Sequence, residues 1–209
     1  MIPRIGNDNY LLKPNKHYAM ILLFCGLSGA GKSTLAEKVR NKLAAEEIFI
    51  EIIDADEYRQ KLFKDLKFSM EDRFENIRRL GFIANKFSSH NIITIISAIN
   101  PYDSIRNELV RTYKNVKVVH IDCDINELIK RDTKGLYKRA LLPDGHPDKL
   151  PNLTGINDPF EAPELPDLHI NTDKLTVKES VNEIRSFIIQ NIVKQKYMYN
   201  TYAHVSNGY

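Results

Sequence analysis

A glycine-rich turn lies near the start of the chain, between a short apolar run and an amphipathic stretch. The apolar run is residues 19–25 (AMILLFC), which is typical of a strand buried on both faces of a parallel sheet. The turn GLSGAGKS follows directly, and residues 32–46 then carry apolar side chains at helical spacing. This order of elements predicts a loop whose backbone N–H groups bind a phosphate at the N-terminus of a helix.

The turn matches G-x-x-x-x-G-K-[ST] at every fixed position. Lys32 is expected to reach the β- and γ-phosphates, and the Ser33 hydroxyl is expected to ligate Mg²⁺. A chance match is the alternative, and the strand before the turn and the helix after it argue against that alternative. We therefore predict a P-loop that binds a nucleoside triphosphate through Gly26, Ser28, Gly29, Ala30, Gly31, Lys32, Ser33 and Thr34.

Strand and helix patterns continue to alternate along the chain. A helix is expected after Asn100, with Asn100 as its N-cap and Pro101 at its first position. Alternation at this spacing predicts an α/β protein with the three-layer P-loop NTPase fold and a parallel sheet. The further strands are expected at 48–53, 91–99, 116–122 and 168–171, and the further helices at 70–90, after Asp124 and after Thr176.

The alternation fails between about residues 132 and 166, where six of the nine prolines lie. Loops of this length are usually functional or disordered, and we predict that this one is an inserted lid. The predicted organisation is an N-terminal extension (1–18), one domain (19–195) that contains the lid, and a C-terminal tail (196–209). We interpret the tail as a helix extension or an ordered arm.

The composition excludes several classes of protein. The 30 basic and 27 acidic residues nearly balance, which argues against a dedicated nucleic-acid binder. The two cysteines are too few for a disulfide framework, and no apolar run is long enough to span a membrane. The N-terminus lacks the apolar core of a signal peptide, so we predict a cytoplasmic protein that binds neither nucleic acid nor membrane.

Two carboxylates follow the second predicted strand, in the segment DADEYR. Asp54 and Asp56 at the carboxyl end of a parallel strand would face the ligand crevice, where they could hold Mg²⁺ or orient an acceptor hydroxyl. The alternative is that these acidic residues lie at a helix N-terminus because the helix dipole favours negative charge there. This alternative accounts for Asp56 better than for Asp54.

Two basic or polar clusters are further candidates for phosphate binding. Arg73 and Asn76 lie at i, i+3 spacing on one predicted helix face, and Arg79 could join them. Five cationic side chains lie at 130–139, at the start of the predicted lid. We predict that one of them, Arg131, binds the triphosphate. Basic lids can close over a triphosphate and exclude water. A solvated charge run is the alternative for both clusters.

The chain resembles the adenylylsulfate kinases, which are P-loop enzymes that phosphorylate the ribose 3′-hydroxyl of adenylylsulfate with MgATP. The resemblance spans about residues 20–192. It rests on GLSGAGKST, DADEYR, FSMEDRFENIRR, NPYDSIR, RDTKGLYKRA and TGINDPFEAPELP.

The resemblance implies a role for each matching residue. Asp56 would position or deprotonate the acceptor hydroxyl with support from Asp54, while Lys32 and Lys134 would neutralise phosphate charge. It also implies ATP and Mg²⁺ as cofactors, a small nucleotide as substrate and a homodimeric assembly. The residues that would bind the acceptor are Arg59, Phe68, Arg73, Asn76, Asn100, Lys134 and Leu153.

Departures from the family pattern concentrate around the acceptor. Leu153 replaces a phenylalanine that forms half of the family's adenine sandwich, and Asn100 replaces a serine that is phosphorylated in some members. The lid is also longer. These changes leave open a related kinase that acts on another nucleotide, such as cytidine diphosphoramidate.

Two other classes compete with the kinase. A GTPase switch would carry an NKxD-type guanine motif after a later strand, and the sequence has none there. A nucleotide-binding sensor or scaffold would have no use for the carboxylates and the basic lid. We therefore predict a kinase for adenylylsulfate.

Overall fold

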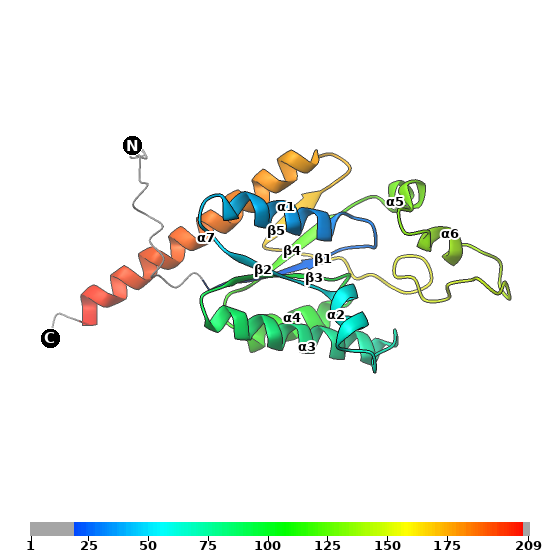
Figure 1. Cartoon of the computed structure of the whole chain (residues 1–209), viewed down its shortest axis with the longest axis horizontal. Helices are drawn as coiled ribbons and strands as arrows, with labels where there is room; N and C mark the ends of the chain where they lie inside the picture. The colour runs from blue at the N-terminus through cyan, green and yellow to red at the C-terminus, as the bar shows by residue number, and fades with distance from the viewer. Residues whose placement is uncertain (1–18, 207–209) are drawn as a thin grey trace.

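The computed structural model describes residues 19–206, with side chains described up to Tyr197. In this part of the chain five parallel strands form one sheet in the order β2-β3-β1-β4-β5 (Figure 1). The strands are β1 (Ile21–Cys25), β2 (Ile50–Asp54), β3 (Ile93–Ser97), β4 (Val116–Asp122) and β5 (Leu168–Asn171). The predicted parallel α/β architecture is therefore confirmed.

Side chains alternate across the sheet because successive residues of a strand point to opposite faces. In β1, Leu22 and Phe24 pack into one hydrophobic cluster, whereas Ile21 and Leu23 pack into the other. All five residues of β1 are buried, as are all five of β3, which explains why both strands read as unbroken apolar runs in the sequence.

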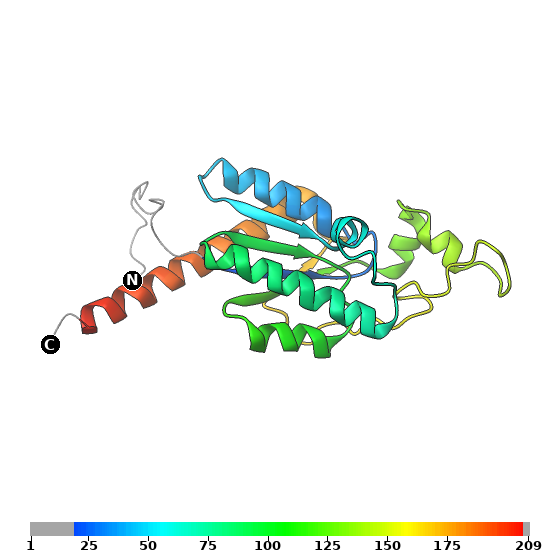
Figure 2. The ribbon, with the colours of Figure 1, turned by 60° about the horizontal axis from the view of Figure 1, so that its bottom comes forward.

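Helices cover both faces of the sheet (Figures 1 and 2). On one face, α1 (Lys32–Ala44) and α7 (Val177–Ser206) pack through leucines, valines and isoleucines. On the other face lie α2 (Ala55–Lys61), α3 (Met70–Ser89) and α4 (Asp103–Thr112). Helices α5 (Ile125–Arg131) and α6 (Leu136–Ala140) lie beyond the sheet, at the end where the strands finish.

Polar side chains start several helices where the sequence indicates. Ser69 accepts a hydrogen bond from the backbone N–H of Asp72 at the start of α3, and Asp124 accepts one from Asn126 at the start of α5. Asp54 caps α2, accepting from Asp56 and Glu57. The same carboxylate therefore ends a strand and starts a helix.

The prediction that Asn100 and Pro101 begin α4 is wrong. The helix begins at Asp103, its N-cap is Tyr102, and Asn100 lies three residues earlier with φ of 46°. Asn100 is buried beside a cavity and its amide bonds to no backbone N–H of the helix. The capping preference is a local rule, and here the tertiary position of the asparagine overrides it.

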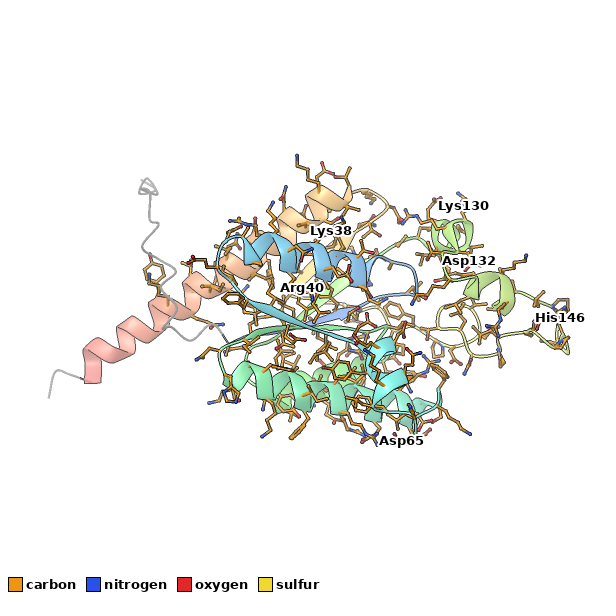
Figure 3. All side chains as sticks on the ribbon, viewed as in Figure 1. Lys38, Arg40, Asp65, Lys130, Asp132 and His146 are labelled. Atoms are coloured by element: carbon orange, nitrogen blue, oxygen red, sulfur yellow. The ribbon has the colours of Figure 1, made fainter. Side chains whose placement is uncertain are left out.

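The predicted lid is not wholly irregular, because it contains the short helix α6. Both carboxylate oxygens of Asp132 accept backbone N–H groups at the start of this helix, from Tyr137 and Lys138. Figure 3 shows Asp132 and His146 on the lid and Lys130 on α5, all at the end of the molecule away from the C-terminal half of α7.

Helix α7 continues through residues 196–206, so the part of the predicted tail that the structure describes is a helix extension. The predicted N-terminal extension (1–18) and residues 207–209 lie outside the described residues. Within the described residues, no helix combines the length and the apolar character that crossing a membrane requires.

Candidate active site

A cavity of about 210 Å³ lies over the glycine-rich turn, at the carboxyl ends of β1, β2 and β3. Ligands of open α/β sheets bind in such a position. We call it the donor cavity. It is lined by Ser28, Gly29, Gly31, Lys32, Ser33, Thr34, Asp54, Asp56, Ser97, Ala98, Ile99, Thr133 and Lys134.

The turn itself requires glycine. At Gly26, with φ of 145°, a Cβ atom would stand 2.1 Å from the carbonyl oxygen of Ile121 in the neighbouring strand. The backbone of the turn can therefore lie directly against the sheet only because no side chain intervenes. Gly31 has φ of 98° and precedes α1, whose first three residues line the donor cavity, so a phosphate there would lie at the N-terminus of a helix.

Lys32 is buried in the donor cavity, and its ammonium is bound by the turn. Its Nζ donates to the carbonyl oxygens of Gly26 (2.9 Å) and Leu27 (2.7 Å). Burial lowers the pKa of Lys32 to about 8. A polyanion placed next to this ammonium would stabilise its charged form, so the site is electrostatically suited to a phosphate chain.

Three oxygen-bearing side chains converge beside Lys32. The Ser33 hydroxyl lies 2.6 Å from Asp54 Oδ2 and 3.1 Å from the Ser97 hydroxyl, while Asp54 Oδ1 caps α2. Hydroxyl and carboxylate oxygens are the ligands that Mg²⁺ prefers, and Mg²⁺ usually binds proteins through one or two of them while phosphates and water complete its shell. Ser33 and Asp54 therefore fit a magnesium ion held together with a triphosphate.

The lid contacts Asp56, the carboxylate two residues after Asp54. Lys134 Nζ lies 2.8 Å from Asp56 Oδ2, and both side chains are exposed. Lys134 also lines the donor cavity, so one cation stands between the predicted phosphate position and the predicted catalytic carboxylate.

A second cavity, of about 60 Å³, adjoins the first one, and we call it the acceptor cavity. Asp56, Ala98 and Ile99 line both cavities. Asp56 is the only ionisable side chain among the residues that line both, so it stands where a group could pass between two ligands. The other residues that line the acceptor cavity are Ala55, Arg59, Phe68, Arg73, Asn76, Ile77, Asn100 and Pro101.

Two buried asparagines that line this cavity have side-chain polar atoms without a hydrogen-bond partner in the described residues. Asn76 is 4 % exposed and Asn100 is 2 % exposed. Asn76 Oδ1 and both amide atoms of Asn100 bond to no group in the described part of the chain. Buried polar atoms are normally hydrogen-bonded, so these three atoms indicate a polar ligand that offers both donors and acceptors, as ribose hydroxyls do.

Phe68 forms an apolar wall of the acceptor cavity and is half exposed. Two guanidinium groups stand over its ring, Arg59 at 5.0 Å and Arg73 at 5.8 Å from the ring centroid. Ring and cations together suit a ligand that carries both a base and an anionic group.

Arg73, on α3, also binds the C-terminal part of the lid through hydrogen bonds to residues 152–158. Its guanidinium donates to Asn152 O (2.9 Å), Thr154 Oγ1 (2.9 Å) and Asp158 Oδ2 (2.8 Å), and its Nε donates to Phe68 O (3.0 Å). The predicted contact of Arg73 with the acceptor stays a prediction, whereas its contact with the lid is a finding.

Three other residues considered in the sequence line neither the donor cavity nor the acceptor cavity. Leu153, a residue of the lid, is buried in the hydrophobic cluster that also contains Leu22 and Phe24 of β1, and it does not line the acceptor cavity. Arg131 pairs with Asp173 at 3.7 Å and lines a small hollow next to the donor cavity. Arg79 pairs with Asp65 and Glu75 and lines neither cavity.

The sequence analysis missed Ser97 and Tyr137. Ser97 ends a run of β-branched residues, and a small polar residue at the carboxyl end of a strand was a readable signal. The Tyr137 hydroxyl donates to the carbonyl oxygen of Ser28 (2.8 Å) and so joins the lid to the P-loop. Burial raises the pKa of Tyr137 to about 12, which keeps this hydroxyl protonated. No local pattern marks Tyr137.

Comparison with known proteins shows the family to which the chain belongs. Residues 18–171 match the protein family described as Adenylylsulphate kinase. The chain is 43% identical over 169 residues to the "Probable adenylyl-sulfate kinase" of Pseudomonas aeruginosa, covering 81% of this chain and 77% of that protein. It is 39% identical to the adenylyl-sulfate kinase of Deinococcus deserti, covering 78% of this chain and 88% of that one.

A solved structure is similar over the same region. The APS kinase of Mycobacterium tuberculosis, in complex with AMPPNP and APS, superposes with a TM-score of 0.76 at 30% identity. The alignment covers 81% of this chain and 97% of that one.

Proposed function

The chain belongs to the adenylylsulfate kinase family, and we propose that it transfers the γ-phosphoryl group of MgATP to the ribose 3′-hydroxyl of adenylylsulfate. The observation that carries the proposal is the position of Asp56, which lines the donor and acceptor cavities together. A carboxylate placed between two nucleotides is what phosphoryl transfer to a hydroxyl requires. The complex of the mycobacterial relative with AMPPNP and APS supports the same assignment of substrates.

We propose that the donor cavity binds ATP through its phosphates. Backbone N–H groups of the P-loop and the Lys32 ammonium would contact the β- and γ-phosphates. Ser33 and Asp54 would hold Mg²⁺, with Ser97 hydrogen-bonded to Ser33 behind them. When bound, Mg²⁺ would neutralise charge that develops on the β- and γ-phosphate oxygens.

We propose that the acceptor cavity binds adenylylsulfate. The face of Phe68 suits the adenine, and the unpartnered amide atoms of Asn76 and Asn100 suit the ribose hydroxyls. Arg59 and Arg73 supply positive charge for the phosphosulfate. Leu153 would contribute through the packing of the lid, since it does not line the cavity itself.

In the transfer, the 3′-hydroxyl oxygen forms a bond to the γ-phosphorus while the bond from that phosphorus to the β–γ bridging oxygen breaks. ADP leaves with the bridging oxygen, and the proton of the hydroxyl passes to the Asp56 carboxylate. Lys134 would move from Asp56 to the transferring phosphoryl group when both nucleotides are present. Closure of the lid would exclude water, which would otherwise accept the phosphoryl group.

The test is an ADP-release assay with MgATP and a panel of acceptors. Saturable release that depends on adenylylsulfate supports the proposal. Release only with another nucleotide, such as cytidine diphosphoramidate, would reassign the acceptor. Among the described residues that line the acceptor cavity, Phe68 is the one aromatic side chain, which is compatible with a different base. If no acceptor causes release of ADP, the chain would be a nucleotide-binding module and not a kinase.

We further propose that the enzyme serves sulfate assimilation in the cytoplasm as a homodimer. Membership of the adenylylsulfate kinase family supports this proposal. Sedimentation equilibrium of the full chain would measure the oligomeric state directly.

A further inference from the structure

A fully buried arginine lies outside both cavities. Arg106, on α4, is 1 % exposed, and it is the largest of the fully buried side chains in the described residues. Its guanidinium donates to the carbonyl oxygen of Asn100 (2.7 Å), the carbonyl oxygen of Glu161 (2.5 Å) and Asp103 Oδ1 (3.1 Å). The Nε of Arg106 has no hydrogen-bond partner in the described residues, so its two terminal nitrogens make all three of these bonds. A buried charge is costly unless it is hydrogen-bonded, which makes these three contacts important for keeping Arg106 in place.

The hydrogen bond from Arg106 to the carbonyl oxygen of Asn100 supports a left-handed backbone conformation, which costs asparagine some free energy. Asn100 has φ of 46°, in the left-handed region. This conformation buries its amide against the acceptor cavity, where both amide atoms lack a partner in the described residues. The amide of Asn100 makes no hydrogen bond within the described residues, whereas its carbonyl oxygen accepts one from Arg106.

The second contact reaches the end of the lid. Glu161 N donates to Pro101 O (2.8 Å), and its carboxylate accepts the backbone N–H of Asp103 (2.6 Å). Arg106 binds the carbonyl oxygen of the same residue. The segment 100–103, the end of the lid and α4 therefore meet at one guanidinium.

We propose that Arg106 is a positioning residue for the acceptor, acting through Asn100. It holds the 100–103 turn against the end of the lid so that the Asn100 amide faces the ribose of the bound acceptor. The inference rests on the proposed function for the identity of the acceptor, but its structural part does not. Lysine cannot replace this arginine, because one ammonium cannot reach three oxygens that the planar guanidinium fork binds together.

The experiment compares Arg106→Lys, Asn100→Ala and the double variant, with KM measured separately for adenylylsulfate and for ATP. We expect each single variant to raise the KM for adenylylsulfate by roughly 10-fold and to leave the KM for ATP within about 2-fold. If Arg106 acts through Asn100, the double variant loses no more than Asn100→Ala alone. If the fold-changes of the two single variants multiply in the double variant, the proposal is overturned. It is also overturned if the KM for adenylylsulfate and the KM for ATP rise equally.

The matched control is Arg185→Lys. Arg185 also makes a two-pronged contact, with Glu46, and it lies on α7 near the C-terminus of α1. We expect this variant to leave both KM values unchanged. If Arg106→Lys does not fold, Asp103→Ala removes one of the three partners of Arg106 at an exposed side chain, and a smaller rise in the acceptor KM alone is expected.

Hydrogen–deuterium exchange separates failure of this inference from failure of the proposed function. In the protein without ligands, Arg106→Lys should speed exchange in residues 98–103 and 160–163, and Arg185→Lys should not. If the wild-type enzyme does not use adenylylsulfate, the proposed function fails and the exchange result still decides the structural part. Unchanged exchange in both segments would overturn the role of Arg106 whatever the acceptor is.

Discussion

The ammonium of Lys134 lies 2.8 Å from the Oδ2 atom of Asp56, which joins the lid to the carboxylate between the two cavities. Both side chains are largely exposed, at 56 % and 77 %. An ion pair this exposed contributes little to folding, so its value is expected to lie in the reaction. The lid thus carries a cation next to Asp56, the carboxylate for which we propose the role of proton acceptor.

Replacing this lysine should separate activity from stability. We expect Lys134→Ala to lower kcat by roughly 100-fold, because a cation on the transferring phosphoryl group is lost. The free energy of unfolding should change by less than about 1 kcal/mol. Steady-state kinetics and urea unfolding measure the two quantities. Lys138→Ala, an exposed lysine of the same lid, is the control, and an equal loss of kcat there would show that general lid charge matters instead.

Asp56→Asn removes the predicted proton acceptor while keeping the shape of the side chain. We expect kcat to fall by roughly 100- to 10,000-fold, the usual range for a general base, while the Kd for ATP changes by less than about 3-fold. Turnover assays and calorimetric titration with an ATP analogue measure these effects. Glu57→Gln, one residue on and paired with Lys61 at the surface, should be nearly neutral. Parallel losses of ATP binding and turnover at Asp56 would contradict a role toward the acceptor.

The pKa of Lys32 predicts how ATP binding depends on pH. Below its value of about 8 in the free enzyme the ammonium is charged and can bind phosphates, and above it the amine is increasingly neutral. ATP affinity should therefore be retained at pH 7 and fall as pH rises through 8, by roughly 10-fold at pH 9. Affinity that stays flat from pH 7 to pH 9 would contradict the burial of this ammonium. Lys32→Ala should abolish turnover at every pH.

Gly26→Ala tests the close approach of the P-loop to β4. The added Cβ would stand 2.1 Å from the carbonyl oxygen of Ile121, and backbone cannot move aside without opening the sheet. We expect a loss of at least about 3 kcal/mol in the free energy of unfolding, measured by denaturant titration. Gly145→Ala is the control, since its φ of 83° is also positive but no atom lies within 4 Å. It should cost only about 1 kcal/mol, from backbone strain.

Much of the fold was readable because its signals are local. The run around β1 is apolar at every position, and helices α3 and α5 carry their own capping residues. Asn100 shows the limit of such rules. Its sequence context predicts a helix cap, but burial beside the acceptor cavity and the contact with Arg106 decide its conformation.

The amino-acid sequence by itself determined the P-loop part of the donor site, because the P-loop is a contiguous segment whose glycines, lysine and serine act through neighbouring backbone. Only the tertiary structure decided how Ser97 joins that part and how the acceptor half is assembled. There Asp56, Asn76 and Asn100 come from three separate segments and meet where the carboxyl ends of parallel strands converge. The contacts of Tyr137 with Ser28 and of Arg106 with Glu161 span 109 and 55 positions of the chain, so no local pattern could have encoded them.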